Sequence, residues 1–545
     1  MVITSQEKSG TLLHGLNKRL LAMAKQLVDI NGLQAKFSLN KDLSPYDMPP
    51  HFFTEAQNVR FLDGKAGKIL GHSQVLGTPT AAPYWAINWL QGSTDLWIYG
   101  GATELYQIDG STHSTVTRTS GGSYTTIAGT TNNWHGGILG GVLVVTNGLD
   151  VPQSFTQAGT DFTDLSDWPS TLRCKAIVPF KNHLVALNLT DSSTEKPFDI
   201  RWSDAIPAGA STNGANTWNT ASTASESAQV SLSGTKGHVL NGLQLGNELM
   251  IYKEDSVYGL TYVGGNFTFR IREVFKDTGM LARDGVVDLG NGSHVFLATN
   301  DVLMHNGTSI RSVIDNHMKT FLFNEIDSTY YYKTFLTHNK LKTEVWICFP
   351  QTGATNGLPD TALIWNYRED TWTIRELPNV NYIAKGEIDP GTTNTWAATT
   401  TAWQDEAFSW ATQEYNPSVD SLLMCGTNDT KLYMADLSTK FDGTNFTMLM
   451  ERTGLGLNDP TKVKSVTSFY PRIDGTGTVD ISIGAELNPF QGVTYSPAVT
   501  FNIGQDNRVD CRVRGKFIAV KFENASSNRF RVSGYAFETE SVSTR

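Results

Sequence analysis

Short apolar runs separated by turn residues recur along most of the chain, and residues 246–327 show them most clearly. Residues 249–252 and 257–263 are apolar and aromatic, and Glu254-Asp255 lies between them. The pair Gly264-Gly265 that follows is a two-residue hairpin signal, because glycine accepts the positive φ angles that tight hairpin turns require. The pattern predicts antiparallel strands joined by short turns.

The residues that follow extend the same pattern. Between 267 and 272 apolar and polar residues alternate with a period of two, which is typical of a strand with one buried face. Apolar runs at 286–287, 295–297 and 302–304 are separated by turn residues rich in Asn, Gly and Asp. Four-stranded antiparallel sheets joined by such turns are the blades of a β-propeller, so we expect a mainly β fold organised around one.

Residues 11–30 carry the clearest helical periodicity, and Asn31-Gly32 supplies a stop signal after them. This narrow stripe predicts an amphipathic helix that packs either on its own domain or on a neighbouring subunit. A second helix is expected near residues 314–321, with Ile314, Met318 and Phe321 on one face. The apolar residues of the first stripe are Leu13, Leu16, Leu20, Met23, Leu27 and Ile30.

These patterns divide the chain into three predicted domains. Residues 1–48 form an amino-terminal arm with the amphipathic helix, and the proline-rich stretch 44–50 links it to the rest. Residues 49–455 form a propeller-like domain of about five or six blades, the last built from runs at 422–425, 432–435 and 446–450. Evenly spaced alternating runs in residues 456–545 predict a β-sandwich-like domain.

Two long stretches interrupt the propeller pattern and offer little to bury. Residues 205–234 are rich in Ala, Ser, Thr and Asn, and residues 391–412 form a second stretch with a weak core that still holds Trp396, Trp403 and Trp410. Long excursions in compact domains are usually functional, so both are expected at the surface as contact elements. The tryptophans either anchor an interface or pack within their own loop.

Composition and charge narrow the choice of partners. The chain has 545 residues, 49 of them glycine, and a formal net charge of -10, which disfavours broad binding to nucleic acid or anionic membranes. No secretory signal or membrane-length apolar stretch is visible, so we expect a soluble protein made in a reducing compartment. Four cysteines lie far apart in strand-like contexts and are expected to be buried free thiols: Cys174, Cys348, Cys425 and Cys511.

The sequence offers little catalytic or metal-binding chemistry. The 11 histidines form neither HxH nor HxxxH pairs, and nucleophile-elbow, phosphate-loop, dinucleotide-binding and EF-hand patterns are missing. The carboxylate pairs Glu254-Asp255 and Glu369-Asp370 lie at predicted turns, where we expect them to be solvated rather than catalytic. We therefore expect no enzyme activity, no catalytic residues, no cofactor and no metal.

Several short tracts between residues 40 and 380 share their texture and spacing with a known family. They are residues 43–50 and 56–59 with Gly67 and Gly71; Thr146-Asn147-Gly148 with Pro152-Gln153; Arg201-Trp202-Ser203-Asp204 ahead of Trp218; and Ile251-Tyr252-Lys253-Glu254 with Tyr258, Tyr262-Val263-Gly264-Gly265, Phe267, Gly279 and the run 296–304 before Asn306-Gly307. Together these tracts resemble the tail nozzle, or tail hub, proteins of short-tailed bacteriophages.

The resemblance implies a structural virion protein, assembled in the host cytoplasm, that forms a hexameric ring below the portal and adaptor rings. Such a ring extends the channel for double-stranded DNA, carries tail fibres or spikes, contacts the host outer surface transiently and keeps the exit shut until ejection. An acidic chain suits a conduit, because cationic walls would hold DNA by counterion release. The excursion at residues 205–234 is a candidate gate element.

Two other classes of protein also fit the sequence. A carbohydrate-binding or carbohydrate-active propeller would need carboxylates and aromatic side chains that converge at one mouth of the propeller. A receptor-binding adhesin or fibre would form trimeric rather than sixfold particles.

Overall fold

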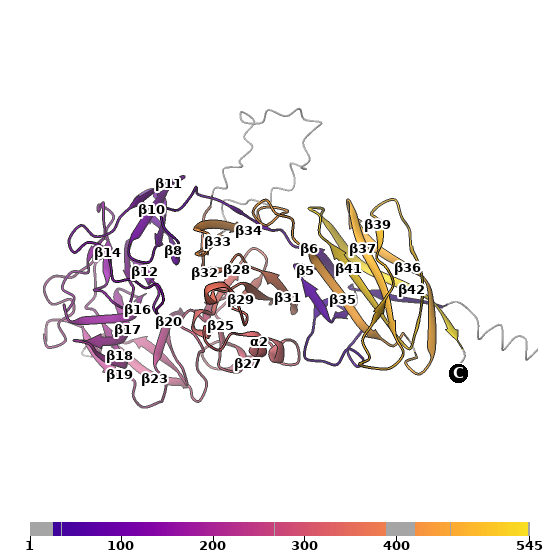
Figure 1. The fold of residues 1–545 in the computed structure, drawn as a ribbon. Helices are drawn as coiled ribbons and strands as arrows, with labels where there is room; N and C mark the ends of the chain where they lie inside the picture. The colour runs from indigo at the N-terminus through magenta and orange to yellow at the C-terminus, as the bar shows by residue number, and fades with distance from the viewer. Residues whose placement is uncertain (1–25, 34, 266, 389–419, 458, 543–545) are drawn as a thin grey trace, which may run out of the picture.

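The computed structural model describes residues 26–33, 35–265, 267–388, 420–457 and 459–542, and its fold is mainly β. Figure 1 shows two lobes side by side. The propeller-like lobe (residues 72–388 and 420–435) is built from small antiparallel sheets. The terminal lobe (residues 26–68 and 448–542) is built from two larger sheets that combine carboxy-terminal and amino-terminal strands.

Seven four-stranded antiparallel units make up the propeller-like lobe, in agreement with the predicted β-propeller-like architecture. Gly264 and Gly265 have φ angles of 70° and 67° and form the predicted turn between two strands of the fourth unit. The units are, in ring order, β8 Trp85–Gln91, β9 Thr94–Gly100, β10 Leu105–Asp109 and β11 Thr112–Thr115; β12 His135–Leu139, β13 Val142–Thr146, β14 Gln153–Phe155 and β15 Thr163–Asp164; β16 Leu172–Phe180, β17 His183–Asp191, β18 Thr194–Trp202 and β19 Ala228–Ser231; β20 Val239–Leu245, β21 Glu248–Lys253, β22 Val257–Tyr262 and β23 Phe269–Phe275; β24 Val286–Asp288, β25 His294–Leu297, β26 Val302–His305 and β27 Ile310–Ser312; β28 Phe335–Asn339, β29 Glu344–Phe349, β30 Thr361–Asn366 and β31 Thr371–Glu376; and β32 Val380–Gly386, β33 Ser421–Gly426, β34 Lys431–Ala435 and β7 His72–Gln74.

The ring of units closes where the last unit meets the first. Strand β32 lies beside β8, and the last unit is completed by β7, which comes from the amino-terminal side of the lobe and pairs antiparallel with β34. Six of the units are separate four-stranded sheets and the other, β28 to β31, is part of a ten-stranded sheet, so the number of five or six blades stays a prediction. Residues 446–450 were assigned wrongly to the last unit: β35 begins at Met448 and pairs with β41 in the terminal lobe.

The terminal lobe contains a ten-stranded and a six-stranded sheet, whose apolar faces share one core. The ten-stranded sheet continues from the sixth unit of the propeller-like lobe, β28 to β31, through β4 Glu55–Gln57, β35 Met448–Leu455, β41 Phe517–Asn524, β37 Thr478–Glu486, β38 Thr494–Tyr495 and β39 Val499–Asn502. The six-stranded sheet contains β40 Val509–Gly515, β36 Val463–Gly475, β42 Phe530–Val542, β6 Lys65–Lys68, β5 Val59–Leu62 and β1 Gln26–Asn31. A short parallel pair, β2 Ser38–Leu39 and β3 Phe52–Phe53, lies between β1 and β4 in the sequence.

The carboxy-terminal part of the predicted first helix is a strand instead. Residues 26–31 form β1, which pairs with β42 from Gln26↔Thr539 to Asn31↔Gly534. Ile30 is 5% exposed because it packs into the core of the terminal lobe, so tertiary burial overrides the helical spacing. Residues 11–25 lie outside the described residues.

The second predicted helix exists but starts later. Helix α2 spans Lys319–Glu325, and Ile314 and Met318 are buried before it begins. Two short 3-10 helices, η1 Tyr331–Lys333 and η2 Thr355–Gly357, lie in loops of the sixth unit. All four cysteines are buried free thiols, as predicted, and burial raises the pKa of Cys174 to about 12.

A buried ionic cluster joins the two lobes. Arg60 of β5 donates to the Glu344 carboxylate of β29 at 2.6 and 3.0 Å and to Asp436 at 2.8 Å. Arg375 of β31, fully buried, donates to Asp436 at 2.8 Å. Although burial opposes ionisation, Arg60 and Arg375 lower the pKa of Asp436 to about 2. Strand pairing also crosses both predicted domain borders, at 48 and at 455, which remain predictions.

Candidate functional site

The first strands of all seven units line one cavity of about 430 Å³ on the axis of the ring. Small-molecule pockets measure roughly 300–1,000 Å³, so this volume suits a small ligand and is far too small for a DNA duplex. Residues that line it, one from each unit in ring order, are Ile87, Gly136, Val178, Gly242, Val287, Leu336 and Ala384.

Arg283, in the connection between β23 and β24, precedes the cavity-lining Asp284 and bonds to backbone at the starts of β12 and β16; we call this side chain the Arg283 strap. Its guanidinium donates to the carbonyl oxygens of Asn133 at 3.0 Å, Trp134 at 3.3 Å and Lys175 at 3.4 Å. These carbonyls belong to the second and third units, whereas Arg283 leads into the fifth. The same guanidinium donates to the Asp284 carboxylate at 3.0 Å. Through its carbonyl partners, this one side chain joins the fifth unit to the second and third units of the ring.

The polar side chains near the Arg283 strap are either uncharged at pH 7 or hydrogen-bonded to backbone. The amide of Asn241 donates to the carbonyl of Arg283 at 2.9 Å, and the Nδ1 atom of His135 accepts from the Ile177 backbone N–H at 3.4 Å. Burial, with the positive charge of Arg283, lowers the pKa of His135 to about 4, so this imidazole is neutral at pH 7. Burial raises the pKa of the Tyr382 hydroxyl well above its usual value.

The two carboxylates of the cavity each hold local structure. Asp284 accepts from Arg283, and Asp288 accepts from the backbone N–H of Gly290 at 2.8 Å. Lys385 also lines the cavity, and burial lowers the pKa of its amine. Glycoside hydrolysis needs two carboxyl groups that face each other across the substrate, one as acid and one as base or nucleophile. Asp284 and Asp288 are the carboxylates that such a reaction would have to use in this cavity.

The carboxylate pairs singled out in the sequence are not brought together by the fold. Glu254 accepts from the His238 backbone N–H at 2.8 Å in the fourth unit. Glu369 accepts from the Asp63 backbone N–H at 3.0 Å, and Asp370 accepts from the indole of Trp365 at 2.9 Å. Glu369 is 9% exposed, so the expectation that this carboxylate is solvated was wrong.

No group of three or more His, Cys, Asp or Glu side chains stands close enough to hold a metal ion in the part of the chain that the structure describes. In the same residues no helix has both the length and the apolar character that crossing a bilayer requires.

A buried hydrogen-bond chain joins the fourth and fifth units, and local sequence patterns gave no signal of it. The Tyr252 hydroxyl lies 2.8 Å from Nδ1 of His294 and 2.7 Å from Nε2 of His305. His305 Nδ1 accepts from the Gly307 N–H at 3.1 Å, and His294 Nε2 lies 3.0 Å from the Gln244 carbonyl. These partners allow one direction only: His305 donates to Tyr252, Tyr252 donates to His294, and His294 donates to the carbonyl.

The excursion at residues 205–234 is better anchored than its composition suggests. Trp218 is 1% exposed and packs edge-on against Trp168, with ring centroids 4.6 Å apart. Arg201 donates to the carbonyl of Trp218, and the indole of Trp202 donates to the carbonyl of Glu226 at 2.8 Å. The prediction that this stretch buries little therefore fails at Trp218, although much of residues 213–224 is exposed. The second excursion, residues 391–412, lies outside the described residues.

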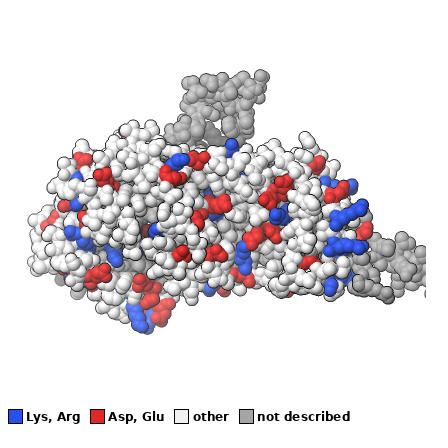
Figure 2. All heavy atoms as spheres, in the orientation of Figure 1, with Lys and Arg blue, Asp and Glu red and all other residues white. Residues whose placement is uncertain are grey.

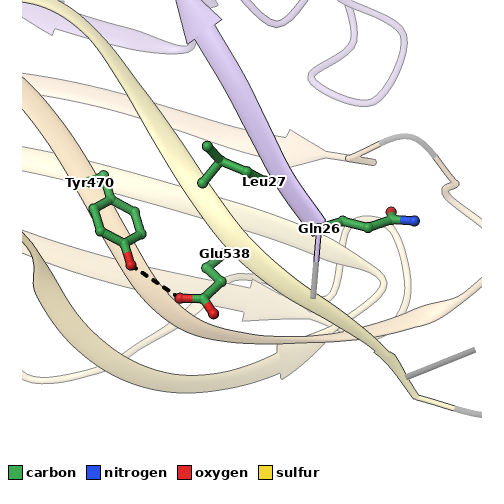
Figure 3. A pocket seen from close by; sticks show the side chains of 4 residues that line it. All are labelled: Gln26, Leu27, Tyr470 and Glu538. Carbon is green, nitrogen blue, oxygen red and sulfur yellow. Dashed lines mark hydrogen bonds between the residues drawn. The ribbon is translucent and has the colours of Figure 1, made fainter. Parts of the chain in front are cut away.

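A second cavity, of about 350 Å³, lies on the outward face of the terminal lobe and is shown in Figure 3. Gln26 and Leu27 of β1, Tyr470 of β36 and Glu538 of β42 line it. The Tyr470 hydroxyl donates to the Glu538 carboxylate at 3.2 Å. It is an open surface feature in which Leu27 is 64% exposed.

Comparisons with known proteins do not place the chain in a family. No family model matches it, and no curated protein matches it. Among solved structures it is similar to the extracellular domain of a putative hybrid two component system from B. thetaiotaomicron, with 10% identity and a TM-score of 0.39, covering 79% of this chain and 47% of that one. This chain thus spans about half the length of that protein.

Two further similarities are of the same order. The N-terminal domain of Nup159 has 10% identity and a TM-score of 0.36, covering 68% of this chain and 94% of that one. A fungal alcohol oxidase solved in complex with copper has 9% identity and a TM-score of 0.37, covering 87% and 99%. At this level of similarity none of these proteins assigns a function to the chain.

Proposed function

We propose that the chain is a structural virion protein that forms the tail nozzle ring of a short-tailed phage. In this role six copies extend the DNA channel below the portal and adaptor, dock tail fibres or spikes, and gate genome ejection. The seven units are then the blades of one propeller, and the terminal lobe is a β-sandwich fused to its sixth blade.

The observation that carries the proposal is the location of the residues behind the family resemblance, which are internal joints rather than members of a site. Tyr252 joins the fourth and fifth units through His294 and His305. Thr146 donates from the second unit to the Cys174 carbonyl of the third at 2.9 Å. Asn58, fully buried, donates to Glu376 at 3.0 Å and so ties the terminal lobe to the sixth unit. A resemblance held by such residues favours a shared architecture over a shared reaction.

The cavity on the propeller axis fits a wall segment better than a conduit. It is about 430 Å³, so the ring of blades inside one copy has no room for a duplex. In a nozzle the DNA channel therefore runs between copies, each copy contributing one sector of the wall.

The charge distribution is compatible with a wall that DNA slides past. Figure 2 shows acidic and basic side chains interspersed over most of one face, with basic side chains gathered at the end of the terminal lobe. The net charge is -10. A duplex binds mainly through phosphate contacts that release counterions, so a wall without a long basic stripe exerts little grip on it.

The proposal is tested by imaging the purified chain alone and with the tail adaptor protein. We expect sixfold rings in negative-stain images and a particle mass about six times the chain mass of 59.8 kDa. Antibody labelling should place the chain below the portal in intact virions. Absence of the chain from virions, or its presence there as single copies, would overturn the proposal.

The role of residues 205–234 in gating is tested in the same virions. Replacing residues 219–225 by a short Gly-Ser link leaves Trp218 and Glu226, which anchor the excursion, in place. If the exposed tip contributes to the gate, filled particles carrying this change leak DNA faster than wild-type particles. Equal retention of DNA would remove the tip from the gate.

Carbohydrate binding is the second candidate, because the axial cavity has ligand-pocket size and carries Trp85, Tyr382 and Asp284 among its lining residues. Aromatic faces and carboxylates are what sugar rings and their hydroxyls contact. Binding on a glycan array that is lost in a Tyr382→Ala variant would favour this function, and release of reducing sugar would indicate a hydrolase.

A further inference from the structure

The outward face of the six-stranded sheet offers one apolar spot in a polar surface. The inward face packs into the core through side chains such as Phe469 and Phe537, both fully buried. On the outward face Leu27 is 64% exposed, pairs in register with Glu538, and borders the cavity beside Tyr470 (Figure 3). Antiparallel sheets tolerate a polar face toward water, and on this face Leu27 is the exposed apolar side chain at the rim of the cavity.

The sequence that precedes Gln26 points to an occupant for this spot. Gln26 lines the cavity, and residues 1–25 precede it. Their sequence places Leu13, Leu16, Leu20 and Met23 at spacings of three and four. An apolar stripe of this kind is stable in water only when a complementary surface buries it.

The charges on this face predict which strand the docked segment follows. In the segment that precedes Gln26, Lys8, Lys18, Arg19 and Lys25 outnumber Glu7, whereas the whole chain is acidic. On the outward face, Glu538 and Glu540 of β42 lie on one side of β36. On its other side Arg508, level with Tyr470, pairs with Asp510 at 3.0 Å, and the exposed Arg512 and Arg514 of β40 follow along the strand. A basic segment is therefore attracted along β42 and repelled from β40.

We infer that residues 11–25 of one copy dock over Leu27 and Tyr470 of a neighbouring copy. The inference rests on the proposed ring. A closed ring needs two different and complementary patches on every copy, and a basic apolar arm with an apolar spot beside acidic side chains forms such a pair. The arm deepens the proposed function by naming one of the contacts that closes the ring.

Cross-linking by engineered cysteines tests where the arm docks. The native cysteines are buried, so wild type is the unlinked control. Full-length chains carrying Leu20→Cys are mixed with chains carrying Tyr470→Cys under ring-forming conditions and then oxidised. We expect a disulfide-linked pair that contains one chain of each kind. A disulfide formed within one chain of the double variant, with none between chains, would overturn the inference in favour of docking on the arm's own copy.

Substitutions separate the arm from the ring itself. Leu16→Asp with Leu20→Asp, and separately Leu27→Asp on the receiving face, should each weaken ring assembly at least tenfold in a concentration series followed by mass photometry. Ala22→Asp adds the same charge on the opposite side of the arm's periodicity and should leave assembly unchanged. Intact rings in both apolar variants would refute the arm contact and leave the proposed function standing. Wild-type chains that never form rings would refute the proposed function instead.

Discussion

At the scale of single residues, a few buried side chains connect units that the backbone alone leaves separate. Tyr252 bridges two histidines, and Arg283 donates to three carbonyl oxygens from two other units. Such groups hold a fold together strongly because a buried donor or acceptor that loses its partner costs roughly 1–3 kcal/mol. Each of these side chains stabilises the fold through the buried donors and acceptors of neighbouring units to which it hydrogen-bonds.

Replacing Tyr252 by phenylalanine should destabilise the chain by about 2 kcal/mol or more, because His294 Nδ1 and the Nε2–H of His305 both lose their partner in a buried site. The measurement is the denaturant midpoint of the purified variant. Tyr331→Phe, at a tyrosine that is 42% exposed, should change stability by less than about 0.5 kcal/mol. Equal stability of the two variants would show that the Tyr252 hydroxyl contributes nothing measurable to the fold.

Replacing Arg283 by methionine keeps much of the side-chain volume and removes the strap. Three carbonyl oxygens and Asp284 lose a donor, so we expect a loss of roughly 2–3 kcal/mol and faster hydrogen exchange at the starts of β12 and β16. Arg512→Met, at an exposed position on β40, is the matched control and should leave both unchanged. Unchanged exchange in the Arg283 variant would show that the strap contributes nothing to holding the ring.

At the scale of elements, the ring depends on a strand that is distant in sequence from its partner. β7 pairs with β34, with Met434↔Ser73 in register, and this pairing joins residues more than three hundred positions apart. Most other blade strands pair with strands that are close to them in sequence. The loop that β7 closes is far longer, and the entropy released when a loop opens grows with its length, although slowly.

Ser73→Pro should therefore open the ring, because proline removes a ladder donor from β7. We expect proteolytic cleavage across the first and last units and a fall in thermal midpoint of several degrees. Ser114→Pro makes the same change in β11, the outermost strand of a unit whose strands are all local in sequence. Equal protease sensitivity in the two variants would argue against β7 as the closing element.

At the scale of the whole molecule, buried histidines make stability depend on pH. Burial lowers the pKa of His72 and His305 to about 3 and of His135 and His338 to about 4, from an ordinary value of 6.5. Below 6.5 the unfolded chain takes up protons that the folded chain excludes, so the unfolding free energy falls as pH falls. Asp436, with a pKa near 2 in the fold, extends this loss below pH 4.

The unfolding free energy should thus decrease from pH 7 to pH 4, by up to about 1.4 kcal/mol per pH unit for each such histidine, and the thermal midpoint should fall with it. His338→Gln should make the decrease shallower, because the unfolded variant takes up one proton fewer than the unfolded wild type. A midpoint that stays constant between pH 7 and pH 5 would contradict the burial of these imidazoles as neutral groups.

Much of the fold is local and could be predicted from the chain itself. Alternating runs, the Gly264-Gly265 turn and isolated apolar cysteines determined the mainly β class, the propeller-like architecture and the four buried thiols, because turn geometry and the two-residue period act over a few residues. The candidate site was less accessible to this reasoning. The axial cavity, its Arg283 strap and the Tyr252 chain arise only where separate units converge.

Tertiary structure decided the rest, because long-range pairing carries no local signature. Residues 27 and 30 fit a helical stripe and residues 28 and 30 fit the inward face of a strand, and the register of β1 on β42 selected the strand. Likewise the run at 446–450 reads equally well as a blade strand or as β35, and the sequence alone cannot show that β7 occupies that place in the blade. Hydrophobic burial chooses between such alternatives only when the partner surface is present.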